Sequence, residues 1–321
     1  MDAPPLSASR SAAGPIALWL RLLLYPGHTF PTAAAPVVVA TGLALHDGVF
    51  QAAPVLLAFL CSWLIHTAGV LVDNYVLLSR HPDLGEHPEL LAGLADGSLT
   101  LGQIRLAIGI CLGLVALPAP YLIVHVGLPA AALGAIGLAA SFGYSLTRFA
   151  LTRTGWADVA FFVMFGVVAV AGSYYASAAF SAPPGFGWVF APAAFAPLSL
   201  VVGLPVGSLI ASILLIDDLR DIAFDRRKGW KTRPVTAGVR ATEIEFAALV
   251  GFAYLAPALL ILMAGFSAWT MLVWLTLPDA ISIGRAVLGG NAEAMRPLSG
   301  RAARLSLDFA VLLAIGLAVR P

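Results

Sequence analysis

The sequence has few charged residues. Only 11% of its 321 residues are Asp, Glu, Lys or Arg, whereas 60% are hydrophobic and the mean hydropathy is +0.92. Average soluble domains carry about 25% charged residues, so this composition excludes an ordinary soluble domain. It predicts a polytopic membrane protein with the lipid bilayer as its partner. The charges are confined to a few loops and form no broad basic face, which excludes a nucleic-acid partner.

Cysteine is also scarce. Cys61 and Cys111 are the two cysteines, and both lie in apolar runs, which disfavours a disulfide or a thiolate metal site. A secretory signal is not evident, because Arg21 interrupts the apolar stretch 15–25 and no small-residue cleavage site follows. We therefore expect residues 1–14 to form a disordered tail, 15–25 an interfacial helix, and 15–321 a single integral-membrane domain.

Runs of about 20 apolar residues predict an all-α transmembrane bundle. The sequence contains nine such runs, near residues 29–46, 52–78, 104–126, 128–147, 157–180, 195–216, 244–265, 267–288 and 303–319. With this assignment, 17 of the 18 Lys and Arg residues fall on one side, leaving Arg320 on the other. The positive-inside rule then places the N-terminus and the charged loops in the cytoplasm.

The most distinctive stretch is residues 213–235, ILLIDDLRDIAFDRRKGWKTRPV. If the apolar helix continues through it, Asp218, Asp221 and Asp225 lie within about 60° of one another on one face. One interpretation is a Mg²⁺ site whose phosphate ligand is held by the basic residues that follow. The other is a solvated loop in which acids and bases pair. The basic residues are Arg226, Arg227, Lys228, Lys231 and Arg233.

The segment DDLRDIAFDRRKGWKT resembles the second aspartate-rich motif of the UbiA superfamily of intramembrane prenyltransferases. It is most similar to the 1,4-dihydroxy-2-naphthoate prenyltransferases of menaquinone synthesis, with the pattern Asn-Asn-x-Arg-Asp-x-x-x-Asp-x-x-x-Gly-Lys-x-Thr. Asp217 and Asp218 replace the two Asn, and Trp230 followed by Lys231 replaces the Lys. The remaining motif positions match at Arg220, Asp221, Asp225, Gly229 and Thr232. Residues 155–175 and 277–285 also resemble that subfamily, so the likeness covers about residues 20–319.

The first aspartate-rich motif departs from the family pattern Asn-Asp-x-x-Asp-x-x-x-Asp. Here Asp73-Asn74 is followed by Leu77 and His81, so both later carboxylates are missing. A shifted loop could supply other acids from further along the chain, namely Asp83, Glu86 and Glu89. The departure keeps a second hypothesis open: an inactive family member that binds a polyprenyl or quinone lipid, or an assembly factor.

The resemblance implies a bundle around a central cavity that opens to the cytoplasmic side of a bacterial inner membrane. It implies transfer of a polyprenyl group from a prenyl diphosphate to a small aromatic acceptor, with Mg²⁺ assisting diphosphate departure. On this basis we assign catalysis to Asp158, Asp218, Asp221 and Asp225, and the metal to Asp73, Asp217, Asp218, Asp221 and Asp225. The expected substrate-binding residues are Asn74, Tyr144, Arg153, Tyr174, Arg220, Lys231 and Arg233.

Several of these residues have a structural alternative. Tyr144 and Tyr174 could shield a cation with their ring faces or anchor span ends at the membrane interface. Asp158 could act in catalysis, or it could be a favourable charge at a helix N-terminus. His66, within the second span, is expected to be a satisfied interior histidine.

Overall fold

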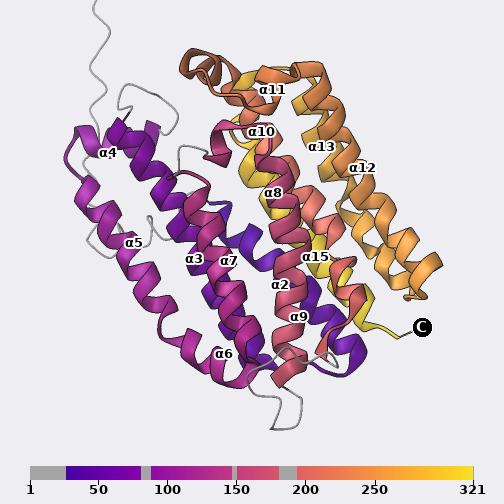
Figure 1. Cartoon of the computed structure of the whole chain (residues 1–321). Helices are drawn as coiled ribbons and strands as arrows, with labels where there is room; N and C mark the ends of the chain where they lie inside the picture. Colours follow the sequence, from indigo (N-terminus) through magenta and orange to yellow (C-terminus); the bar gives the residue numbers. More distant parts are fainter. Residues whose placement is uncertain (1–26, 81–87, 147–149, 181–193, 321) are drawn as a thin grey trace, which may run out of the picture.

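The computed structural model describes residues 27–80, 88–146, 150–180 and 194–320, and these ranges contain helices and no strand (Figure 1). The predicted tail 1–14 and interfacial helix 15–25 lie outside them. The helices are α2 (Thr29–Asp47), α3 (Ala52–Arg80), α4 (Pro88–Ala95), α5 (Leu101–Val115), α6 (Pro118–Val126), α7 (Leu128–Gly143), η1 (Leu151–Arg153), α8 (Ala157–Val163), η2 (Met164–Val168), α9 (Ala169–Phe180), η4 (Pro197–Leu200), α10 (Leu204–Lys228), α11 (Arg233–Thr236), α12 (Val239–Ala264), η5 (Ala268–Thr276), α13 (Leu277–Leu288), α14 (Ala292–Met295) and α15 (Leu298–Ala318).

The long helices lie side by side in one bundle, as Figure 1 shows. α15 packs against α2, α10 and η5, while α3 packs against α5, α7 and α9. Small residues allow the closest approaches: a Cβ on Gly42 would lie 2.5 Å from the Cα of Ala314. Such contacts are typical of helices in lipid, where close packing replaces the hydrophobic effect as the source of association.

The membrane-protein prediction is confirmed, but the count of nine spans is not. Seven helical segments within the described ranges are long and apolar enough to cross a bilayer. The apolar helix α7 has only 16 residues, and α15 carries Arg301, Arg304 and Asp308 along its length. Both run alongside the other helices in the bundle (Figure 1).

α10 continues without a break to Lys228, beyond the predicted end of the sixth span near residue 216. Its 25 residues make it about 37 Å long at 1.5 Å per residue, longer than the ~30 Å hydrocarbon core. Gly229 ends the helix with φ 69°, a conformation that favours glycine. The acidic stretch is therefore the last turns of a membrane helix, as the helical-face argument requires.

α3 continues to Arg80, so Asp73 and Asn74 are helical residues. Thr100 caps α5 and exchanges hydrogen bonds with Gln103 in a capping box. α12 begins at Val239, and the Thr242 hydroxyl donates to the carbonyl of Gly238 from inside the helix.

Candidate active site

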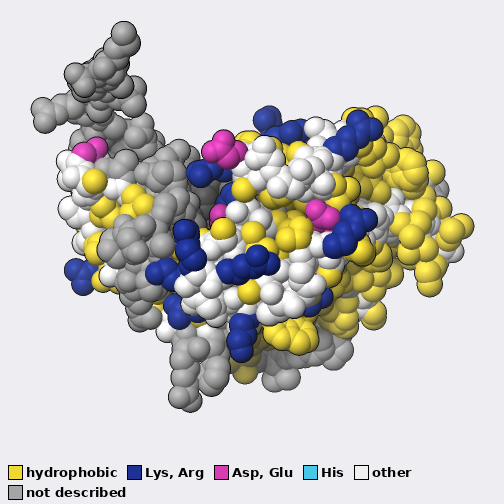
Figure 2. All heavy atoms as spheres, turned by 90° about the horizontal axis from the view of Figure 1, so that it is seen from above, with side chains coloured by type: hydrophobic (Ala, Val, Ile, Leu, Met, Phe, Trp, Pro, Cys, Tyr) yellow, Lys and Arg dark blue, Asp and Glu magenta, His cyan; other side chains and the backbone are white. Residues whose placement is uncertain are grey.

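A cavity of about 960 Å³ lies within the bundle, between α3, α7, α8, α9 and α10. Its deep part is apolar, with Ile65, Leu133 and Ile210 among its walls. Its mouth lies at the end of the bundle where Lys and Arg side chains gather around a hollow (Figure 2). The charged residues that line it are Asp73, Asp217, Asp218, Arg220, Asp221, Asp225 and Arg296. The structure thus places a charged mouth directly over an apolar chamber.

Two helices supply the acids from opposite parts of the sequence. α3 contributes Asp73 together with Asn74, and α10 contributes its four aspartates from just over two turns of helix. The prediction that Asp218, Asp221 and Asp225 share one helix face agrees with their position on the wall of one cavity. The solvated-loop interpretation is wrong, since these residues are helical and at most partly exposed.

Protein donors hold most of these carboxylates. Arg220 contacts Asp221 through two parallel bonds, Nε to Oδ1 at 2.9 Å and Nη2 to Oδ2 at 2.5 Å. Its Nη1 also lies 2.6 Å from Oδ1 of Asp217. Hydroxyl groups donate to three of the carboxylates: Ser299 to Asp217 at 2.5 Å, Thr232 to Asp225 at 2.6 Å and Ser145 to Asp73 at 2.5 Å. These bonds fix the mouth's side chains in place.

The oxygen donors at the mouth suit Mg²⁺, which prefers carboxylates, phosphates and water. Within the described ranges, however, no three His, Cys, Asp or Glu side chains lie close enough together to hold a metal ion. The Asn74 side chain is only 2% exposed, and its Nδ2 has no hydrogen-bond partner. A buried amide without a partner is costly, which indicates that a ligand completes this edge of the mouth.

The position where the family's first motif has its second acid is filled differently here. Leu77 is buried and packs with Phe224 and Trp230 in a small apolar cluster that joins α3 to the end of α10. Trp230 also lines the mouth, and its ring meets Phe224 edge-on at 5.3 Å. A contact between the helices therefore replaces a carboxylate. His81, Asp83 and Glu86 lie outside the described residues, as does the side chain of Glu89.

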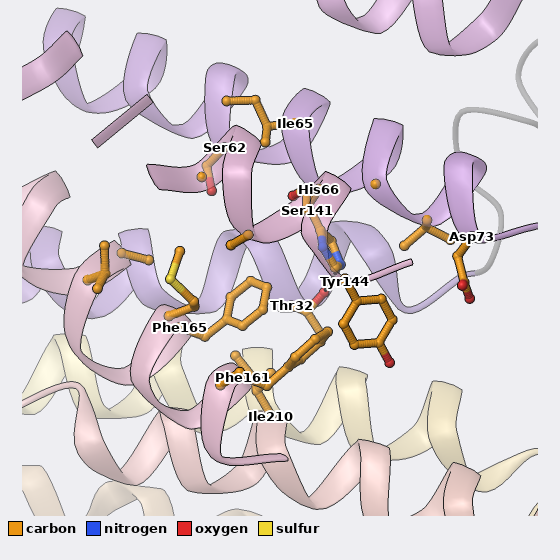
Figure 3. A pocket seen from close by; sticks show the side chains of 18 of the residues that line it. Thr32, Ser62, Ile65, His66, Asp73, Ser141, Tyr144, Phe161, Phe165 and Ile210 are labelled. Atoms are coloured by element: carbon orange, nitrogen blue, oxygen red, sulfur yellow. Dashed lines mark hydrogen bonds between the residues drawn. The ribbon is translucent and has the colours of Figure 1, made fainter. Parts of the chain in front are cut away.

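Below the mouth, aromatic and polar side chains face each other across the cavity (Figure 3). His66 Nε2 lies 3.2 Å from the Thr32 hydroxyl, and its ring meets Phe165 edge-on at 5.3 Å. Tyr144 packs against Phe161 at 5.5 Å. The hydrogen bond agrees with the expected satisfied histidine, but the sequence did not predict that His66 lines the cavity. The i, i+4 spacing of Phe161 and Phe165 was the only sequence signal for that pair.

A π-helical turn in the wall that carries Phe165 lets this wall pack closely against α10. Between α8 and α9 the chain forms a π-helical turn, η2, in which Phe165 lines the cavity. Gly166 in the same turn lies against α10, where an added Cβ would come within 3.0 Å of the Cα of Gly207. Wide turns of this kind are frequent at functional sites. The glycine contact brings the aromatic wall close to the helix that carries the acids.

His28 adds an imidazole to the mouth. It lines the cavity just before α2 begins. Desolvation of its half-buried ring lowers the pKa of His28, an effect that Arg220 reinforces and Asp217 opposes. Its proximity to Arg220 was not evident from the sequence.

Four of the predicted site residues lie behind the mouth. Asp158 is buried near Glu245, and Arg233 donates to Glu245 Oε2 at 2.5 Å, which raises the pKa of Arg233. The backbone N–H of Lys231 donates to the carbonyl of Arg153 at 2.9 Å, and its side chain is exposed. The Arg153 guanidinium lies 5.5 Å from the centre of the Trp230 ring, with a buried Nε that has no partner.

Tyr174 lies at the other end of the bundle. Its hydroxyl donates to Asp47 Oδ2 at 2.5 Å, where α2 ends. It does not line the cavity with Tyr144, so the structure separates two aromatics that the sequence analysis grouped.

Comparisons with known proteins identify the family of this chain. The model of the UbiA prenyltransferase family matches residues 33–292. A 1,4-dihydroxy-2-naphthoate octaprenyltransferase of Escherichia coli is 28% identical over 90% of this chain and 92% of its own length. The protein of the same name from Mycobacterium tuberculosis is 30% identical, over 82% of this chain and 84% of its own length.

Solved structures share the fold. A UbiA homolog from Aeropyrum pernix superimposes with a TM-score of 0.65 at 17% identity, covering 90% of this chain and 96% of the homolog. A digeranylgeranylglyceryl phosphate synthase gives a TM-score of 0.55 at 12% identity, covering 94% and 99%. The sequence resemblance is thereby confirmed, and the hypothesis of an inactive binder or assembly factor finds no support in the relatives' names. The chain belongs to the UbiA prenyltransferase family of integral-membrane enzymes.

Proposed function

We propose that this enzyme transfers a polyprenyl group from a prenyl diphosphate to an aromatic acceptor of the 1,4-dihydroxy-2-naphthoate type, with Mg²⁺ as cofactor. The observation that carries the proposal is the position of the charged mouth directly above an apolar cavity of about 960 Å³. A prenyl diphosphate has the same division, with a highly charged head on a long apolar tail. The names of the relatives support the acceptor class.

Mg²⁺ bound at the mouth would neutralise charge on the departing diphosphate. The residues that would hold it are Asp73, Asp217, Asp218, Asp221 and Asp225. Asn74 and Arg220 are the phosphate donors nearest this site, because both line the cavity mouth. Lys231, Arg153 and Arg233 lie just behind it, where their charges attract the diphosphate and hold the loop that borders the mouth.

The reaction begins when the allylic C–O bond breaks and its electron pair leaves with the diphosphate. The ring faces of Tyr144 and Phe161 are placed to stabilise the resulting allylic cation. The ring carbon that bears the acceptor's carboxylate then attacks the cation, and loss of that carboxylate as CO₂ returns the electron pair of the broken C–C bond to the ring and restores aromaticity. His66 and Thr32 are the polar groups beside this pair of rings, and we assign them to the acceptor's hydroxyls.

Asp158 has an indirect part in this proposal. It lies next to Arg233 and Glu245 and not on the cavity wall. We therefore treat it as a positioning residue that holds Arg233 through electrostatic attraction.

The orientation of the protein in the membrane follows from the distribution of Lys and Arg: the mouth faces the cytoplasm of a bacterial inner membrane, with the N-terminus on the same side. Residues 15–321 form one domain.

The proposal is tested with detergent-purified protein, Mg²⁺, a radiolabelled prenyl diphosphate and a panel of aromatic acceptors. Diphosphate release and prenylated product are followed together. We expect equal amounts of both with 1,4-dihydroxy-2-naphthoate, and none without divalent cation. Absence of product with every acceptor, or full activity in excess chelator, would contradict the proposal.

A further inference from the structure

Arg220 occupies an unusual position at the mouth. Its guanidinium is held by Asp221 on one side and Asp217 on the other, through three contacts of 2.5–2.9 Å. The three side chains are only 19–24% exposed, so water screens the contacts weakly. Bidentate pairs of this kind are the strongest charge-assisted hydrogen bonds in proteins.

These contacts conflict with metal binding by the same carboxylates. Both oxygens of Asp221 and one oxygen of Asp217 already accept bonds from Arg220, and Asp217 Oδ1 also accepts from Ser299. A divalent cation that used these oxygens would have to displace the guanidinium. Displacement would leave an arginine in a partly buried site without its counter-ions, which is costly.

A diphosphate would remove that cost, because its anionic oxygens can accept paired hydrogen bonds from the planar guanidinium. Two unsatisfied donors suit such an anion, one at the mouth and one behind it. Asn74 Nδ2 at the mouth and Arg153 Nε behind it are both buried without a hydrogen-bond partner, and Arg153 lies close enough to Asp73 to interact with its charge.

We propose that Arg220 is an internal counter-ion that couples metal binding to diphosphate binding. Without substrate it neutralises Asp217 and Asp221 and opposes entry of the metal; when diphosphate arrives, it transfers to the phosphate oxygens and frees the carboxylates. This inference rests on the proposed Mg²⁺-dependent function. Its consequence is that metal and diphosphate bind with positive cooperativity, and reciprocity requires each to raise the other's affinity by the same factor.

The test is Mn²⁺ binding, measured by electron paramagnetic resonance with and without inorganic pyrophosphate. For the unaltered enzyme we expect pyrophosphate to tighten Mn²⁺ binding by about tenfold, within the usual range of coupling between sites. Arg220→Gln should bind Mn²⁺ alone about tenfold more tightly, and most of the effect of pyrophosphate should disappear. Arg220→Lys keeps the positive charge but lacks the paired N–H donors of the guanidinium, and it should bind Mn²⁺ with intermediate affinity.

Arg296→Gln is the matched control. Arg296 lines the same cavity near Asp221, yet it forms no ion pair with any side chain that the structure describes. Its removal changes the local charge equally without freeing a carboxylate, so it should tighten Mn²⁺ binding less than Arg220→Gln and leave the pyrophosphate effect intact. Thermal melting confirms that each variant is folded.

The outcomes separate the two proposals. Mn²⁺ binding that Arg220→Gln leaves unchanged or weakens, or that Arg296→Gln tightens equally, would overturn the role of Arg220 while leaving the metal site in place. Absence of Mn²⁺ binding to the enzyme and all three variants, with or without pyrophosphate, would overturn the metal-dependent function and this inference together.

Discussion

The two acidic edges of the mouth are built differently. The α10 edge has four aspartates and an arginine that neutralises two of them. The α3 edge has one aspartate, one unsatisfied asparagine and a leucine that packs against α10. The comparison teaches that α10 carries most of the negative charge at the mouth, while α3 joins the helices and offers an amide donor to the proposed diphosphate. Substitutions on the two edges should therefore differ in size and kind.

The largest effect is expected at Asp225 on the α10 edge. Asp225→Asn removes a carboxylate that forms no ion pair with an arginine in the described ranges, and it should lower kcat/KM by about 10³, or about 4 kcal/mol of transition-state stabilisation. Steady-state kinetics with labelled prenyl diphosphate provide the measurement. Asp96→Asn, at an exposed loop position away from the cavity, is the control and should retain full activity. An Asp225→Asn enzyme with full kcat/KM would remove this residue from the metal site.

A smaller loss is expected on the α3 edge. Asp73→Asn should lower kcat/KM by about 10², because it removes the carboxylate of the α3 edge while the acids of α10 remain. The Mg²⁺ concentration that gives half-maximal activity should rise at the same time. If Asp73→Asn proved as damaging as Asp225→Asn, the two edges would be equivalent and the comparison would fail.

Substitution of His66 tests whether the aromatic acceptor binds at a different place from the diphosphate. His66→Leu should raise the KM for the aromatic acceptor by about tenfold and leave the KM for prenyl diphosphate nearly unchanged, since it removes about 1.4 kcal/mol of binding to the acceptor. His66→Gln, which keeps a hydrogen-bonding side chain, should recover part of the loss. Equal changes in both KM values would indicate a general distortion of the cavity.

The smallest effect on catalysis should come from Leu77. Leu77→Ala removes part of the cluster with Phe224 and Trp230 and should destabilise the fold by about 2 kcal/mol. A lower melting temperature with kcat reduced less than tenfold is the expected result. A melting temperature that does not change would show that the cluster does not hold α3 and α10 together.

Sequence reasoning identified the membrane bundle, the family and the acidic face of α10, because those features depend on local patterns. Hydropathy marks spans, and helical spacing places Asp218, Asp221 and Asp225 together whatever surrounds them. The count of nine spans is not confirmed where length and charge are marginal, in α7 and α15. The end of α3 lies two residues past the predicted end of its span, whereas α10 continues well beyond residue 216.

Features that depend on tertiary contacts were not predictable. The i, i+3 spacing of Asp217 and Arg220 favours an ion pair along one helix, but the resemblance assigned Arg220 to the substrate instead. His28 and His66 are far apart in the sequence, and only the packing of α2 against α3 brings both to the cavity. Leu77 looked like a lost ligand, whereas the fold gives it a packing role. The resemblance grouped Tyr174 with Tyr144, but Tyr174 lies at the opposite end of the bundle, beside Asp47.

The most direct test of the central claim is a structure of the enzyme with Mn²⁺ and an unreactive prenyl thiodiphosphate. Anomalous scattering would locate the metal. The account predicts Mn²⁺ and the diphosphate at the mouth between Asp73 on α3 and Asp225 on α10, with the prenyl chain in the apolar cavity below. A metal bound elsewhere, or a prenyl chain outside the cavity, would contradict it.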